Sequence, residues 1–197
     1  MGPGCAARPA APEAPISLAA VPIRYGKGAV EPAAFVISEA EWRSVAALFD
    51  PPAPTAAQER EAIAEAVGVL ERIAGEQTPA GEDLARNASP YGSVGQMDCI
   101  DESTNTDVYL RLLAQEGLLA HHDVERPVRR YRWLIGAHRT AVVRERATGE
   151  LFAVDSWFRD NGEPAVVLPL AVWRTGRADP PPPASGGRRE VRTAARE

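Results

Sequence analysis

Cysteine and histidine are scarce in this chain of 197 residues, which has two cysteines and three histidines. Cys5 stands in an N-terminal stretch rich in Ala, Pro and Gly, and Cys99 stands near the middle of the chain. A disulfide framework or a zinc site built from Cys and His pairs needs more of these residues. We expect the two cysteines not to pair, since one lies in a flexible tail, and we expect neither a metal nor a cofactor.

The chain also lacks an excess of basic residues and any long apolar run. Its net charge is −5 and 25% of its residues are charged, which argues against nucleic acid or an anionic membrane surface as a partner. No run approaches the ~20 apolar residues that a transmembrane helix needs, so we expect no transmembrane segment. The hydrophobic content of 45% suits one domain with a sizeable core.

Composition divides the chain into a central domain and two tails. Residues 1–15 and the Pro- and Arg-rich residues 179–197 are predicted to be disordered, and residues 16–178 to form one domain. Cys5, followed by a flexible tether, is similar to the acylated cysteine of a bacterial lipoprotein. In that interpretation the true start lies upstream and the protein is anchored to the envelope. An incidental cysteine in a flexible tail explains the same residues.

The first part of the domain predicts short strands and two helices. Residues 16–37 read as strands broken by proline and glycine. Ser38 and Thr55 are each followed three residues later by Glu or Gln, which is the pattern of a helix N-cap. We therefore predict helices from Ser38 to Phe49 and from Thr55 to about Ala74, each with an apolar face that packs in the core.

Cys99 stands where a third helix is predicted to begin. Residues 100–116 carry apolar side chains at helical spacing and end at Gly117. A free thiol has a pKa of about 8.5, and the N–H groups at a helix N-terminus lower it, which favours the attacking thiolate. Asp98 is expected to cap this helix and Asp101 to bind a strand or loop N–H, although carboxylates beside the sulfur work against the thiolate.

A histidine and an aspartate follow on predicted strands. The predicted elements after the helix are strands over residues 128–135, 138–146, 150–156 and 165–170, and a short helix over 169–173. The second and third strands are joined by a short glycine-containing turn, which places His138 within a few positions of Asp155. Asp155 can then accept a hydrogen bond from one imidazole nitrogen while the other nitrogen faces Cys99. This is the nucleophile, base and orienting group of cysteine and serine hydrolases.

Each of these residues also has a plain structural explanation. A lone cysteine is ordinarily a small buried apolar residue, His138 could be a core histidine, and Asp155 could end a strand. Their order and strand context together favour catalysis. His121 and His122 are expected to lie exposed in a loop, where they make a poor metal site.

Two further residues are candidates for contact with a substrate. Gln96 lies just before Cys99 and could donate to an oxyanion together with the backbone N–H of Cys99, or simply hold its loop. Trp157 could cover the catalytic residues from solvent or simply pack. Residues 75–94 are predicted to form a polar loop along one wall of a cleft.

Several short motifs in residues 95–158 share one family pattern. They are Asp98-Cys99-Ile100-Asp101-Glu102, Leu112-Leu113-Ala114-Gln115-Glu116-Gly117-Leu118, His138 with Val142-Val143, and Ala153-Val154-Asp155. This segment resembles the transglutaminase-like superfamily, and within it the bacterial transglutaminase-like cysteine proteinases. The resemblance implies an α+β fold with a papain-like core, in which the helix carrying Cys99 packs on an antiparallel sheet carrying His138 and Asp155. Arg139 and the polar residues 103–106 depart from the family pattern.

The expected function is therefore that of a cysteine hydrolase, a peptidase or amidase that acts on a peptide or protein through a thioacyl-enzyme. Release of the acyl group to an amine instead of water, and a peptidoglycan-type peptidase, remain open at this stage. A different class of function is a non-catalytic peptide-binding domain on the same fold, with the polar helix face at residues 103–105 as its binding surface.

Overall fold

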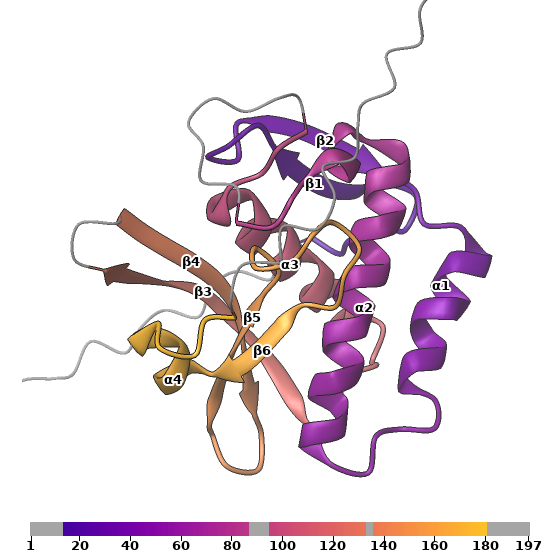
Figure 1. Cartoon of the computed structure of the whole chain (residues 1–197). Coiled ribbons are helices and arrows are strands. Elements are labelled where there is room, and N and C mark those ends of the chain that lie inside the picture. The colour runs from indigo at the N-terminus through magenta and orange to yellow at the C-terminus, as the bar shows by residue number, and fades with distance from the viewer. Residues whose placement is uncertain (1–13, 87–94, 133–135, 181–197) are drawn as a thin grey trace, which may run out of the picture.

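The computed structural model describes residues 14–86, 95–132 and 136–180 (Figure 1). The predicted tails, 1–15 and 179–197, lie outside the described residues except at their inner ends, as does the last part of the predicted loop over 75–94. The described chain has an α+β fold with four α-helices and two antiparallel sheets. In chain order the elements are β1 (Val21–Tyr25), β2 (Glu31–Phe35), α1 (Glu39–Ala46), α2 (Ala56–Gln77), α3 (Cys99–Gln115), β3 (His122–Arg132), β4 (Gly136–Glu145), β5 (Leu151–Asp155), β6 (Val166–Pro169) and α4 (Leu170–Thr175).

The first two helices begin where their caps were predicted. The Ser38 hydroxyl accepts the N–H of Glu41, whose carboxylate accepts the N–H of Ser38 in return, and a short 3₁₀ turn carries the chain on to Phe49. Thr55 caps α2 in the same position. Helix α2 runs past its predicted end at Ala74 to Gln77, and Gly75 within it lies against the backbone of Gly81, where a side chain would not fit.

The larger sheet is a meander in the order β3-β4-β5-β6, and helices cover both of its faces (Figure 1). Ala141, Val143 and Val154 face the main core, where they pack with the buried stripes of α2 and α3. Val142 and Ala153 point to the opposite face and pack under α4. The period of two along each strand thus fixes which side chains meet which helix.

The apolar stripe predicted for α2 forms the centre of the main core. Its members are fully buried or nearly so: Ile63, Ala66, Val67, Leu70 and Ile73. Removing each large aliphatic side chain from water contributes about 1.5–3 kcal/mol, so this helix anchors both the small β1–β2 sheet and α3.

The prediction that His122 lies exposed in a loop is wrong. Strand β3 begins at this residue, and the imidazole is fully buried. Its Nδ1 lies 2.8 Å from the carboxylate of Glu59 on α2, which also accepts the N–H groups of Ala120 and His121. Burial raises the pKa of Glu59, but these hydrogen bonds outweigh it and the pKa is lowered. The partner that allows His122 to be buried is Glu59, which is far away in the sequence, so the local sequence pattern could not predict this burial.

Among the helices that the structure describes, none combines the length and apolar character needed to cross a bilayer.

Candidate active site

Helix α3 begins at Cys99, as predicted, and two aspartates shape its first turn. The Asp98 carboxylate accepts the N–H groups of Ile100 and Asp101 at 2.8 and 3.1 Å. The buried Asp101 carboxylate accepts the N–H of Asp98 and also reaches the N–H groups of Lys27 and Ala29 in the β1–β2 turn. The cap predicted for Asp98 and the loop contact predicted for Asp101 are thus both present.

Cys99 itself is partly exposed at the helix N-terminus. Its Sγ lies 3.8 Å from the carbonyl oxygen of Ala137, the residue before His138. The Asp98 carboxylate takes up the next two N–H groups, and the N–H of Cys99 is one of the first-turn groups that have no partner within the helix. The helix start therefore offers both a sulfur and a spare N–H at one place.

His138 and Asp155 meet where β4 begins and β5 ends. The imidazole Nε2 lies 2.7 Å from Asp155 Oδ2, and the side chains are 12% and 2% exposed. Ala141 pairs with Val154 in the sheet, and the same register brings His138 close to Asp155, as the hairpin pattern indicated.

The surroundings of His138 favour its charged form. Burial lowers the pKa of the imidazole. The interactions with Asp155 and Cys99 raise it by more than burial lowers it, so the net pKa is about 9. Nε2 is engaged by Asp155, which leaves Nδ1 for the sulfur of Cys99. The structure thus brings the three predicted catalytic side chains together from three separate elements.

Trp173 on α4 is a site residue that sequence reasoning missed. It is fully buried, and its Nε1 donates to the same Asp155 Oδ2 at 2.6 Å, while its ring centroid lies 5.5 Å from that of His138. Arg130 is the cross-strand partner of His138, and its guanidinium carbon lies 4.4 Å from the centroid of the Trp173 ring. The same guanidinium donates to the two carboxylate oxygens of Asp179 at 2.8 and 2.6 Å. Asp155 Oδ2 therefore has two hydrogen-bond partners, His138 Nε2 and Trp173 Nε1.

Two more aromatic rings close around the imidazole. The Trp157 ring centroid lies 4.7 Å from that of His138, and the Phe158 centroid lies 5.4 Å away. Trp157 is half-buried, so it both packs on the imidazole and shields it from solvent. Its Nε1 is buried with no hydrogen-bond partner among the described residues.

Gln96 and the polar residues of α3 serve the fold. The Gln96 side-chain amide donates to the carbonyl of Glu82, so this N–H holds the loop before Cys99. Ser103 and Asn105 are buried, and Asn105 both donates to and accepts from the backbone of Arg24 at 2.8 Å. The prediction that this polar face is a peptide-binding surface is therefore wrong, because Ser103 and Asn105 are buried and Thr104 is half-buried.

A cluster of buried carboxyl groups lies behind the site, and no local pattern indicated it. The Ser156 hydroxyl donates to Glu102, and the N–H of Met97 donates to Asp83 at 2.6 Å. Burial, followed by the charge of Glu102, raises the pKa of Asp83 to about 9, and burial raises the pKa of Glu71 to about 7. Burial also raises the pKa of Glu102. Protonation of these acids limits the negative charge behind Cys99 and His138.

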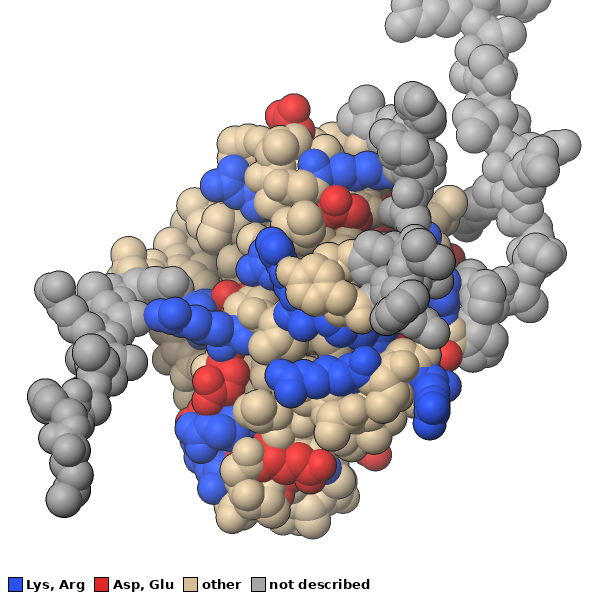
Figure 2. Space-filling model, turned by 90° about the vertical axis from the view of Figure 1, so that its left-hand side faces the viewer, with Lys and Arg blue, Asp and Glu red and all other residues tan. Residues whose placement is uncertain are grey.

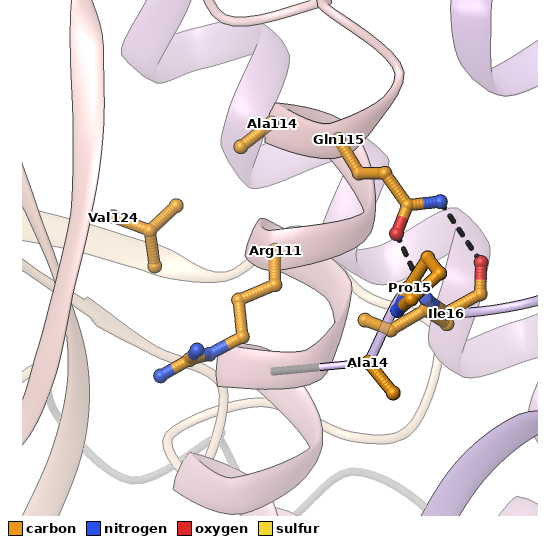
Figure 3. Close-up of a pocket in the computed structure, with 7 residues that line it drawn as sticks. All are labelled: Ala14, Pro15, Ile16, Arg111, Ala114, Gln115 and Val124. Atoms are coloured by element: carbon orange, nitrogen blue, oxygen red, sulfur yellow. Dashed lines mark hydrogen bonds between the residues drawn. The ribbon is translucent and has the colours of Figure 1, made fainter. Parts of the chain in front are cut away.

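A cavity of about 470 Å³ lies elsewhere, between residues 14–16, the C-terminal half of α3 and β3 (Figure 3). The Gln115 amide pairs with both backbone groups of Ile16 beside it, so this hollow marks the seam where the N-terminal segment docks. Its lining includes no nucleophile or general base. Among the described residues, no group of three His, Cys, Asp or Glu side chains could hold a metal ion.

No protein-family model, curated protein sequence or solved structure significantly matches this chain.

Proposed function

We propose that this protein is a cysteine hydrolase with a transglutaminase-like, papain-like core that cleaves amide bonds in a peptide or protein. Cys99 is the nucleophile, His138 the base and Asp155 the orienting group. The observation that carries the proposal is the 2.7 Å contact between His138 and Asp155, formed next to Ala137, whose carbonyl oxygen lies 3.8 Å from the Cys99 sulfur at the N-terminus of α3. A cysteine-bearing helix packed on an antiparallel sheet supports the finer fold assignment.

The first chemical step follows from the charge state of the pair. An imidazolium beside the sulfur and the N-terminus of α3 both stabilise a thiolate. The thiolate attacks the amide carbonyl carbon, and the carbonyl electron pair moves onto oxygen. The spare N–H of Cys99 is placed to donate to that oxyanion. When the tetrahedral adduct collapses, the C–N bond breaks and His138 gives its Nδ1 proton to the leaving amine.

The second step releases the acyl group from sulfur. His138, now neutral, takes a proton from water as the water oxygen attacks the thioester, and the Cys99 thiolate leaves. An amine in place of water gives acyl transfer by the same route. Asp155 holds the orientation of the imidazole through both steps, because its carboxylate accepts one N–H from His138 and is itself fixed by a second N–H from Trp173.

Alkylation of Cys99 tests this proposal without knowledge of the substrate. Iodoacetamide rates are measured from pH 5 to pH 10 in a Cys5→Ser background, with His138→Gln as the matched variant. A thiol of pKa about 8.5 is less than about 1% ionised at pH 6. We expect rapid alkylation at pH 6 that the His138 variant loses. Identical profiles with a midpoint near pH 8.5 would refute the triad and leave a binding domain on this fold.

Cleavage itself is tested on a mixed peptide library read by mass spectrometry. New N-termini should appear with the wild type and be absent with Cys99→Ala, whose circular dichroism should be unchanged. A labelled primary amine added to the same reaction separates the two outcomes of the second step, since its incorporation reports acyl transfer. Cleavage retained by Cys99→Ala would end the proposal.

A further inference from the structure

Arg86 presents buried donors that the fold leaves unused. Its Nε and Nη2 are buried and have no hydrogen-bond partner among the described residues. These two nitrogens lie on one edge of the guanidinium, and their N–H groups point the same way, which is the geometry that binds a carboxylate through two parallel hydrogen bonds. Leaving buried polar groups unpaired costs free energy, so such an edge needs an explanation.

The position of Arg86 ties it to the catalytic residues. Its guanidinium carbon lies 4.8 Å from the centroid of Phe158, whose ring lies 5.4 Å from the His138 ring. The Arg86 N–H donates to the carbonyl of Trp157 at 2.7 Å, and the Trp157 ring also packs on His138. The guanidinium therefore belongs to the same aromatic wall that encloses the imidazole.

The backbone of Arg86 is also held in an unusual conformation. Its φ is +59°, in the left-handed region that residues other than glycine enter at a cost. Strain of this kind persists where the surrounding structure enforces it, and it is concentrated at functional sites. Here the hydrogen bond to Trp157 and the contact with Phe158 enforce it.

A second unused donor and the local charge point to the same ligand. Trp157 Nε1 is buried without a partner among the described residues and belongs to the same wall. Basic side chains gather across the middle of the face shown in Figure 2, with acidic ones at the edges of the group. A basic face of this kind attracts anions.

We propose that Arg86, assisted by the Trp157 Nε1–H, binds a carboxylate of the substrate, so that the enzyme selects peptides with an acidic group beside the scissile amide. The acidic group is either a Glu or Asp side chain or a free α-carboxylate. Arg86 is thus a specificity residue that touches the substrate. The inference rests on the proposed function of Cys99 as nucleophile.

Two alkylating reagents that differ only in charge test this role without turnover. Iodoacetate carries a carboxylate and iodoacetamide does not, so the ratio of their rates at Cys99 reports anion binding near the sulfur. In the Cys5→Ser background, Arg86→Gln should lower the iodoacetate-to-iodoacetamide ratio about tenfold or more, and taking the ratio cancels any general change in the reactivity of the thiol. Arg86→Lys should lose most of the preference as well, because an ammonium lacks the two-pronged edge.

Arg159→Gln is the matched control, because it removes the same charge from an exposed position in the segment that follows Phe158. Its ratio should stay within about twofold of the parent if a bound carboxylate rather than general attraction sets the preference. An unchanged ratio in Arg86→Gln, or equal losses in the two Gln variants, would overturn the proposal. Loss of the His138 dependence of iodoacetamide alkylation would instead overturn the proposed function, so the two failures are distinct.

Equilibrium binding gives an independent reading and identifies the source of the carboxylate. In Cys99→Ser, the Arg86 Nε–H and Trp157 Nε1–H resonances are followed during titration with three small ligands. N-acetylglutamate α-amide carries only the side-chain carboxylate, N-acetylglutamine only the α-carboxylate, and N-acetylglutamine amide neither. Saturable shifts with one of the first two and none with the third support the proposal, and shifts with none of them contradict it.

Discussion

Replacing Asp155 with asparagine should remove a pH-dependent part of the stability of this protein. The folded-state pKa of His138 is about 9, compared with an ordinary value of 6.5. Each pKa unit corresponds to about 1.4 kcal/mol, so protonated His138 contributes about 3 kcal/mol to the free energy of unfolding. The imidazole is only 12% exposed, so solvent reduces this figure little.

The direction of the pH dependence follows from the sign of the shift. Because the folded pKa lies above the unfolded value, the stabilisation is fully present below about pH 6.5 and is lost as the pH rises through 9. In Asp155→Asn the main charge that raises the pKa is gone and burial, which lowers it, remains. The difference in unfolding free energy between wild type and variant should therefore shrink by about 3 kcal/mol between pH 6 and pH 10.

Urea unfolding at several pH values measures this difference. The chain has only three histidines, so NMR titration of their ring protons gives the pKa of His138 directly. His138→Gln is the control, because it removes the imidazole but keeps the Asp155 charge, and its difference from wild type should show the same trend with pH. A His138 pKa near 6.5 in the wild type, or differences that do not change with pH, would refute the reasoning.

Two further predictions concern the frame of the site. Gly95→Ala should lower the melting temperature by more than about 10 °C, because φ is +91° and a Cβ would overlap the carbonyl of Pro79. Gly117→Ala, also at positive φ but in open space, should cost only about 1 kcal/mol, and similar losses in both would contradict this explanation. Asp83→Asn keeps the acceptor for the N–H of Met97 but cannot ionise. The raised pKa of Asp83, about 9, makes the wild type lose stability as the pH rises from about 4 to 9, so the variant should become more stable relative to the wild type across that interval. Urea unfolding that shows a constant difference between the two would count against this explanation.

Local signals made the helix starts and the hairpin predictable. Ser38, Thr55 and Asp98 cap helices with side chains that bond within a few residues, so a short stretch of sequence contains the whole interaction. The approach of His138 to Asp155 is equally local, because one short turn and a period of two determine it.

Interactions between distant elements were not predictable. Trp173 lies 18 residues after Asp155 and reaches it only because α4 folds back over the sheet. His122 can be buried because the carboxylate of Glu59, on α2, hydrogen-bonds its Nδ1. The cluster of buried carboxyl groups forms only where the segments that carry Glu71, Asp83, Glu102 and Ser156 meet. The charge pattern or periodicity of any one of these segments does not predict that meeting.

The ion pair between Arg130 and Asp179 forms late in synthesis relative to Cys99, because Asp179 lies far along the chain. Cys99 leaves the ribosome roughly 80 residues before Asp179, an interval of about 4–16 s at ordinary rates of translation. Until Asp179 emerges, Arg130 holds α4 only through the carbonyl of Trp173, so the contacts that place Trp173 against Asp155 are incomplete. A nascent chain therefore carries Cys99, the proposed nucleophile, before the contacts that fix Asp155 are complete.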